Sequence, residues 1–159
     1  MKKILVETSA RHIHLSREAV DALYGAGYEL TKKKDLSQPG QYACAERLDV
    51  VGPKGKIKAS ILGPTRPASQ LELSLTDARS IGVSALIRES GDIAGTQGCK
   101  LVNPETGAEY VLPEGVIAAK RHIHPHPRLQ LNLAFPTRRS YPLRSIPSVP
   151  RSLVTLLSE

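Results

Sequence analysis

Hydrophobic and polar residues alternate along much of the first 124 positions, in short runs separated by Gly and Pro. The clearest run covers 56–62, where Lys56, Lys58 and Ser60 alternate with apolar residues. A period of two is typical of a strand with one buried face. Residues 71–75 alternate again, and short runs bounded by turns predict further strands at 4–10, 44–51, 85–88, 99–102, 108–112 and 116–119.

Helix and turn signals lie between these strands. Ser16 is a favoured N-cap residue, and the helix that it opens is predicted to end near Gly25. A second helix, of one turn, is predicted to be capped by 76–77 and to stop at Gly82. Residues 38–41 (Gln-Pro-Gly-Gln) have Pro and Gly where a type II turn needs them. Many short strands with Gly/Pro turns and small helices favour a barrel or a sandwich.

Composition excludes several classes of protein. The chain has 159 residues, of which 40% are hydrophobic, so it can bury a compact core. Aromatic residues make up only 4%, which argues against a protein that stacks nucleic-acid bases, although the net charge is +7. No apolar run approaches the length of a membrane span, and Glu7 interrupts any signal-peptide core. Two widely spaced Cys match no metal or redox motif, so we expect a cytoplasmic protein that binds neither membrane nor nucleic acid.

The last part of the chain, 125–159, differs in kind from the rest. It holds half of the 12 Pro and five Arg, and it has no Gly, Lys or Asp. One interpretation is a disordered or surface-bound tail, and the other is a segment foreign to the body, such as the product of a shifted reading frame. Either way we expect an irregular segment, with no regular strand after Leu133 and with ready proteolysis at its Arg residues.

All five His residues lie in two places. Arg11-His12-Ile13-His14 follows the first predicted strand, and the identical string 121–124 follows the last, with His126 just beyond. On an extended segment, His-x-His directs both rings to one face, and two converging pairs would offer four nitrogen ligands to zinc or a similar ion. Each pair alone could simply pack or cap, but the repetition of the string favours a metal site.

Two further side chains could take part in chemistry. Glu72 is a candidate carboxylate ligand, although its place in an alternating strand by itself predicts a solvated face. Arg66 lies between Pro64 and Pro67 in a stiff loop, where its fork of donors could bind phosphate or could be an ordinary surface group. The Gly-containing segments 89–92 and 95–98 could add backbone N–H groups, a weaker signal.

Taken in order, the motifs of residues 4–124 closely resemble the phosphate propanoyltransferases of propanediol utilisation. These are phosphotransacylases found with bacterial microcompartments. Six blocks carry the resemblance: 11–16 (RHIHLS), 35–41 (DLSQPGQ), 51–55 (VGPKG), 62–66 (LGPTR), 88–92 (RESGD) and 119–124 (AKRHIH).

The resemblance implies a mainly β fold: two small antiparallel β-barrels capped by short helices. Residues 1–118 would form the first barrel region, and 119–159 would begin a second, incomplete one. A dinuclear zinc site would lie between them, with one ion held by His12 and His14. The other would be held by Glu72, His122 and His124.

The resemblance also implies the reaction: an acyl-CoA and phosphate give an acyl phosphate and CoA. Arg66 matches the family's phosphate-binding Arg, and Gln41, Ser90 and Ala119 match segments near coenzyme A. A homo-oligomer and a microcompartment association are compatible with this, but no targeting helix precedes the first strand.

The sequence departs from the family's pattern after residue 124, where a further His would complete the second zinc site and none follows His126. Two alternatives to the enzyme therefore stay open. One is a non-enzymatic metal-binding β module, which would keep both His pairs and would not need Arg66. The other is an inactive, truncated or frame-shifted member of the family.

Overall fold

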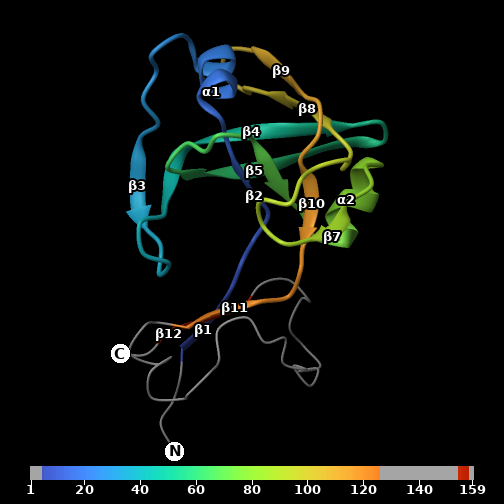
Figure 1. Ribbon diagram of the computed structural model, residues 1–159. Helices are drawn as coiled ribbons and strands as arrows, with labels where there is room; N and C mark the ends of the chain where they lie inside the picture. Colours follow the sequence, from blue (N-terminus) through green and yellow to red (C-terminus); the bar gives the residue numbers. More distant parts are fainter. Residues whose placement is uncertain (1–4, 126–153, 158–159) are drawn as a thin grey trace, which may run out of the picture.

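The computed structural model describes residues 5–125 and 154–157, which form a mainly β structure with two helices (Figure 1). Most of the described chain belongs to one nine-stranded mixed sheet, in the order β7-β10-β6-β2-β5-β4-β8-β9, with β3 also paired to β4. Its strands are β2 (His12–His14), β3 (Lys32–Asp35), β4 (Tyr42–Gly52), β5 (Gly55–Gly63), β6 (Gln70–Glu72), β7 (Leu86–Arg88), β8 (Cys99–Val102), β9 (Glu109–Leu112) and β10 (Val116–Ala119).

The hairpin of β4 and β5 forms the middle of this sheet. The two strands pair from Tyr42 opposite Gly63 to Gly52 opposite Gly55, so the predicted turn at 52–55 is confirmed. Leu48 of β4 and Ala59 of β5 lie opposite each other and are fully buried, whereas Lys58 is exposed. The alternation seen in the sequence is therefore the alternation between core and surface.

The first histidine pair forms a strand of its own, β2, between β5 and β6. It runs parallel to β5 and antiparallel to β6. Ile13 faces Leu71 across the β2–β6 pair, and both side chains are fully buried in the core. Because side chains alternate along a strand, the residues on either side of Ile13 lie on the opposite face.

Three of the four helix caps are those that the sequence predicts. Helix α1 (Arg17–Tyr24) begins after Ser16, whose hydroxyl accepts a hydrogen bond from the Ala19 N–H, and ends at Gly25. Helix α2 (Leu75–Ile81) ends at Gly82 in the left-handed conformation, as predicted, but its N-cap is Ser74, two residues before the expected cap. The turn at 38–41 is also confirmed by positive φ at Gly40 and a Gln41 N–H to Gln38 carbonyl hydrogen bond.

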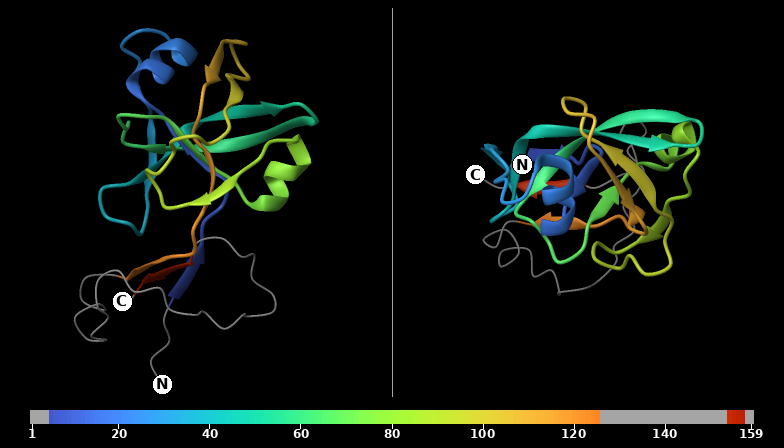
Figure 2. Two further views of the ribbon diagram at one scale, coloured as in Figure 1. Left: turned by 45° about the vertical axis from the view of Figure 1, so that its right-hand side comes forward. Right: turned by 90° about the horizontal axis from the view of Figure 1, so that it is seen from above.

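A second, three-stranded sheet lies apart from the large one in Figure 1 and in the left view of Figure 2. It contains β1 (Leu5–Thr8), β12 (Val154–Leu157) and β11 (Ile123–Pro125), in that order. The chain passes between the sheets at 9–11, from β1 to β2, and again at 120–122, from β10 to β11. The repeated Arg-His-Ile-His strings therefore begin at the two passages, which run in opposite directions.

The expectation of antiparallel barrels needs correction. Three pairs in the large sheet are parallel (β2·β5, β6·β10 and β7·β10), because their strands come from distant segments rather than from hairpins. Within the described residues, the sheet has two ends, at β7 and β9, and is not closed into a barrel. The boundary predicted at 118/119 stays a prediction.

Four strands lie outside the predicted ranges: β2 and β11, which include residues of the two His-Ile-His strings, and β3 and β12, which the pattern of the sequence did not predict. Lys32–Asp35 forms β3 although all four residues are exposed, so no alternation marks it and only its backbone pairing with β4 reveals it. Val154–Leu157 forms β12, so the expectation of no regular strand after Leu133 is wrong there. The segment follows the last Pro, at position 150, and is rich in β-prone residues. The rest of the tail prediction concerns 126–153 and 158–159, outside the described residues.

The absence of a side chain at Gly52 lets α2 approach the central hairpin. A Cβ at this position would overlap the backbone carbonyl of Ile81, which also accepts a hydrogen bond from the Lys54 N–H at 3.0 Å. We expect Gly52→Ala to lower the free energy of unfolding by about 1–3 kcal/mol, because backbone must move to relieve the overlap. Chemical denaturation would measure this, with exposed Lys58→Ala as the control, and equal stability of the two variants would contradict the prediction.

Candidate metal and phosphate site

Three metal-ligating side chains come together on the polar face of β2 and β6. His12 lies directly opposite Glu72 in the antiparallel pair, and His14 lies opposite Gln70. Cross-strand partners share a face, so the pairing of Ile13 with Leu71 in the core directs these four polar side chains to the other side. The period of two thus creates the cluster from two short segments far apart in the sequence.

The geometry of the cluster fits a metal ion. One ligand atom from each of His12, His14 and Glu72 lies within 4.8 Å of the others, and all three residues are at most 8% exposed. Nε2 of His12 is 3.6 Å from Oε2 of Glu72, and the two imidazole rings lie edge to face with centroids 5.2 Å apart. Two imidazoles and a carboxylate are a common zinc donor set. Alternation alone predicted that Glu72 lies on a solvated face, and its burial shows that this prediction is wrong.

The orientation of two histidine rings repeats between the two strings. Nδ1 of His12 lies 2.9 Å from the carbonyl of Ala10, and Nδ1 of His122 lies 2.6 Å from the carbonyl of Lys120. In each case the ring donates its Nδ1 proton to the carbonyl two residues earlier. A neutral ring held in this way carries its lone pair on Nε2, and a backbone carbonyl is a usual partner of a metal-binding histidine.

His14 is held in its neutral form. Burial lowers the pKa of its imidazole to about 3, with further contributions from the nearby charges of Arg66 and His12, while a hydrogen bond to the backbone of Leu62 acts in the opposite direction. Its Nδ1 is buried and, within the described part of the chain, has no hydrogen-bond partner. A neutral imidazole with an unpartnered nitrogen is the form that binds metal.

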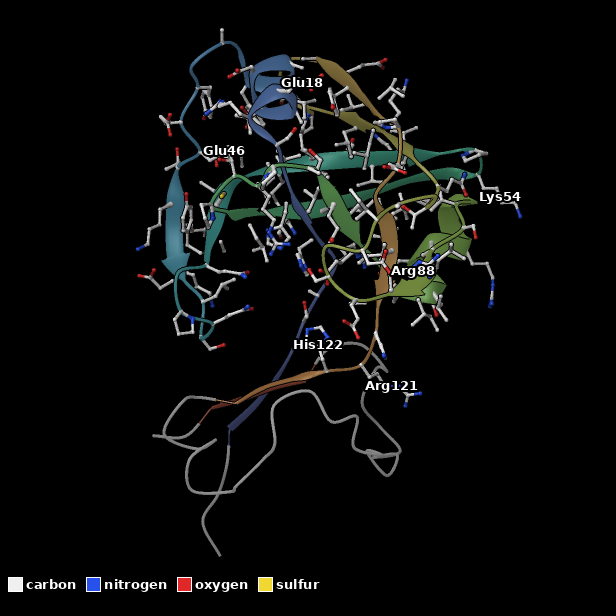
Figure 3. The ribbon with its side chains drawn as sticks, in the orientation of Figure 1. Glu18, Glu46, Lys54, Arg88, Arg121 and His122 are labelled. Atoms are coloured by element: carbon white, nitrogen blue, oxygen red, sulfur yellow. The ribbon has the colours of Figure 1, made fainter. Side chains whose placement is uncertain are left out.

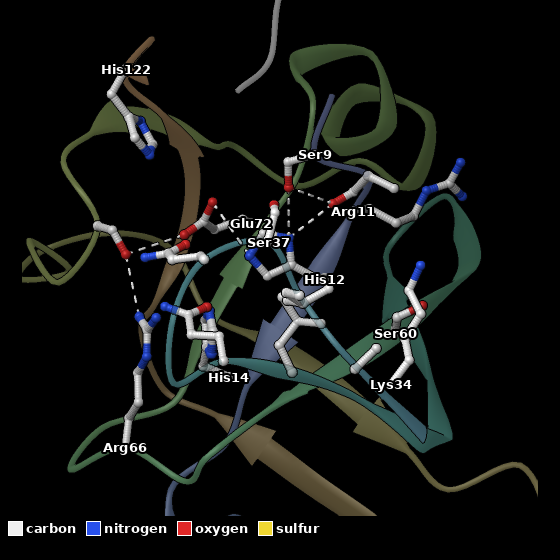
Figure 4. A pocket seen from close by; sticks show the side chains of 17 residues that line it. Ser9, Arg11, His12, His14, Lys34, Ser37, Ser60, Arg66, Glu72 and His122 are labelled. Carbon is white, nitrogen blue, oxygen red and sulfur yellow. Dashed lines mark hydrogen bonds and ion pairs between the residues drawn. The ribbon is translucent and has the colours of Figure 1, made fainter. Parts of the chain in front are cut away.

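The cluster opens into a cavity of about 610 Å³ that is also lined by Arg66, the residue predicted to bind phosphate (Figure 4). Arg66 lines it from the loop after β5, held by a hydrogen bond from its own N–H to the Leu15 carbonyl. Its guanidinium donates to the hydroxyl of Ser90 at 3.3 Å. Partial burial lowers the pKa of Arg66, and the charge of Glu72 opposes that shift. Arg66 is therefore a half-buried cation beside the triad.

Other predicted residues are placed as follows. Gln41 and Ser90 line the same cavity, and so does His122, which lies between the two sheets at the passage from β10 to β11 (Figures 3 and 4). Ala119 ends β10, opposite Arg88, and does not line the cavity. The backbone of His124 belongs to β11, but its side chain lies outside the described residues.

Gln70 is a buried residue of the site that the sequence motifs did not single out. The residue is 2% exposed, and its amide donates to Glu72 and to Ser90 and accepts from the N–H of Gly91. The signal was present, because Gln70 and Glu72 are two positions apart and therefore share a face in any strand. Lys34, Ser9 and Ser37 also line the cavity, although none of them was predicted as a site residue.

The family is settled by comparison. The sequence model of the phosphate propanoyltransferase family matches residues 5–138. The chain belongs to this family. The match extends beyond residue 124, after which the sequence was expected to depart from the family, and 126–138 of this extension lie outside the residues that the structure describes.

Curated phosphate propanoyltransferases are similar to most of this chain. A protein of Listeria monocytogenes is 56% identical over 123 residues, which are 77% of this chain and 57% of that protein. One of Leptotrichia buccalis is 59% identical over 122 residues, 76% and 56% respectively. One of Salmonella typhimurium is 48% identical over 127 residues, 79% and 59%. The chain thus covers less than two thirds of these relatives' own length.

In the described part of this family member, neither helix is long and apolar enough to cross a membrane. The cytoplasmic location stays a prediction. The six sequence blocks and the family match agree on the same region of the chain, and that region contains the triad and Arg66.

The neutral state of His14 predicts a pH dependence of stability in protein freed of metal by a chelator. The unfolded chain takes up a proton on this ring below its ordinary pKa of 6.5, whereas the folded chain does so only near 3. Stability is therefore lost as the pH falls from about 6.5 towards 3. Denaturant unfolding across this range should show a weaker pH dependence for His14→Gln than for the unmodified chain. The same slope in both proteins would contradict the prediction.

Proposed function

We propose that this chain supplies the metal- and phosphate-binding part of a phosphate propanoyltransferase that moves a short acyl group between coenzyme A and phosphate. The observation that carries the proposal is the opening of the His12–His14–Glu72 triad and of Arg66 into one cavity. A metal site alone would not need a half-buried guanidinium beside it. The name of the curated relatives supplies the reaction.

Zinc is the proposed metal, and the residues present fit it. The unpartnered Nδ1 of His14, the carbonyl-bound ring of His12 and the carboxylate of Glu72 form a suitable donor set. We assign one ion to His12 and His14, and a second to Glu72 with His122 and His124. Glu72 lies beside His12, so the two proposed ion positions are neighbours, with the Glu72 carboxylate next to a ligand of the first ion.

The reaction joins a phosphate oxygen to the thioester carbonyl carbon, and the C–S bond then breaks to release CoA as its thiolate. Bound zinc would supply Lewis acidity toward the carbonyl or the leaving sulfur. Arg66 would bind phosphate through two of its donors, hold it for attack and offset its charge. A guanidinium suits this role because its donors form a planar fork that matches two phosphate oxygens.

The remaining assignments concern coenzyme A and the arrangement of the chain. We propose that Gln41, Ser90 and Ala119 lie along the bound CoA, two of them in the cavity wall and one at the end of β10. Residues 1–118 are proposed as the first region and 119–159 as the start of a second, with β1 of the first paired to β12 of the second. Propanoyl-CoA is the proposed substrate, and a homo-oligomer is the proposed assembly.

The first test concerns the metal. We expect the purified chain to contain zinc, and Glu72→Gln to weaken zinc binding at least tenfold, because a neutral amide is a poor ligand compared with a carboxylate. Competition with a chromophoric chelator would measure the affinity. Glu109→Gln, an exposed carboxylate of β9, is the matched control and should bind as the unmodified chain does. Equal affinities for all three proteins would remove Glu72 from the site.

The second test concerns Arg66. We expect Arg66→Ala to raise the KM for phosphate about 10- to 100-fold, since a charge-assisted hydrogen bond contributes about 1.5–3 kcal/mol. Zinc content should stay normal, and Arg66→Lys should restore little, because an ammonium group lacks the fork. Arg79→Ala, exposed on α2, is the control. Acyl-phosphate formation is the measurement. An active Arg66→Ala protein with an unchanged KM for phosphate would exclude the assigned role.

A chain that binds zinc but forms no acyl phosphate would instead support the non-enzymatic metal-binding module. The comparison relatives do not favour that alternative.

A further inference from the structure

The side chain of Gln70 connects the parts of the site that come from different segments. Its Nε2 donates to Oε1 of Glu72 at 2.7 Å and to Oγ of Ser90 at 2.9 Å, and its Oε1 accepts from the Gly91 N–H at 2.6 Å. The residue is 2% exposed, so these bonds form away from water. One amide therefore links β6 to the turn at 89–92.

The direction of the amide follows from its partners. The Gly91 N–H can only donate, so the atom that faces it must be the amide oxygen. Both protons of Nε2 then point to Glu72 and Ser90. In the reverse orientation the amide oxygen would face the carboxylate of Glu72, and the amide N–H groups would face the N–H of Gly91.

This amide fixes which carboxylate oxygen is available to the histidines. Oε1 of Glu72 accepts from Gln70 and, at 3.3 Å, from the hydroxyl of Ser90, whereas Oε2 faces Nε2 of His12. Ser90 is fixed as well, because its oxygen accepts from Gln70 and from Arg66 and its one proton goes to Glu72.

The backbone of Gln70 does not need these bonds. Strand β6 is already paired on both sides, with β2 and with β10, and the Leu71 N–H is bonded to the Gly115 carbonyl. All three hydrogen bonds of the side chain are directed to the carboxylate, the hydroxyl or the turn that carries that hydroxyl. The side chain therefore organises the site rather than the strand.

We propose that Gln70 is a positioning residue, which holds Glu72 in the orientation that binds metal and holds Ser90 against Arg66. The role rests on the proposed function, because it acts through the proposed ligand Glu72. Partners that orient a ligand in this way typically change metal affinity by about 10- to 100-fold when they are removed.

The first variant, Gln70→Met, removes all three hydrogen bonds while keeping the length of the side chain and its lack of charge. We expect the dissociation constant for Co²⁺, used as a spectroscopic substitute for zinc, to rise about 10- to 100-fold. Titration followed by visible absorption would measure it. An affinity equal to that of the unmodified chain would overturn the proposal.

The second variant, Gln70→Glu, distinguishes two roles of the side chain: orienting Glu72, and only attaching the turn at 89–92 to β6. Its carboxylate still accepts from the Gly91 N–H, but it repels Glu72 where Gln70 donates to it. We expect an altered Co²⁺ absorption spectrum, because the spectrum reports the ligands and their geometry. If Gln70 only fastened the turn, this variant would give the spectrum of the unmodified chain, and the proposal would be wrong. It also decides the question if Gln70→Met does not fold.

Gln97 provides the matched control. Its Oε1 also accepts a backbone N–H, that of Ser84 at 2.6 Å, but it is exposed and lies outside the cavity of the triad. Gln97→Glu adds the same charge and should leave the Co²⁺ spectrum and affinity unchanged, and a change equal to that of Gln70→Glu would overturn the proposal.

The test also separates this proposal from the proposed reaction. An unmodified chain that binds Co²⁺ but forms no acyl phosphate contradicts the reaction, while the two Gln70 variants still decide the role of the amide. A chain that binds no Co²⁺ contradicts both the metal triad and the role of Gln70.

Discussion

The pairing of β2 with β6 is the constraint on which the rest of the site depends. Each strand has only three residues, and the pair places Ile13 opposite Leu71 in the core. That contact fixes the register, and a shift of one residue would bury the polar partners and expose the apolar ones. With the register fixed, His12 must lie opposite Glu72 and His14 opposite Gln70. The grouping of these polar side chains is thus a consequence of hydrophobic packing one residue away.

Burial gives these polar groups their properties. A charged imidazole inside the sheet would be costly, so His14 stays neutral, and the nearby guanidinium of Arg66 adds to the same effect. The carboxylate of Glu72 offsets part of that positive charge and is itself held by Gln70 and Ser90. Removing one of these groups would leave another buried and unpaired. For this reason the variants described above are expected to act through their neighbours as well as by direct loss of a contact.

The second copy of the Arg-His-Ile-His string adds a histidine, His122, to the cavity of the triad. The chain passes between the two sheets twice, in opposite directions, and an Arg-His-Ile-His string begins at each passage. The first string leads from the small sheet into the large sheet, whereas the second leads from the large sheet into the small one. His12 and His122 then line the same cavity with the same Nδ1-to-carbonyl contact. The two repeated strings therefore place a histidine each in one cavity because the two passages run in opposite directions between the sheets.

The sequence by itself determined the local structure and the chemistry to look for. Alternation predicted β5, and short runs bounded by Gly and Pro turns predicted β8 and β10. Ser16 and Gly25 predicted the ends of α1, and the repeated histidine string predicted a metal site. These features depend on neighbouring residues, so a single chain reveals them. Only the tertiary structure decided the parallel pairs, the exposed strand β3, the burial of Glu72 and the hydrogen bonds of Gln70. Each of these features depends on which distant segment of the chain lies beside the strand. Alternation shows that a strand has a polar face, but it does not show whether another part of the chain covers that face.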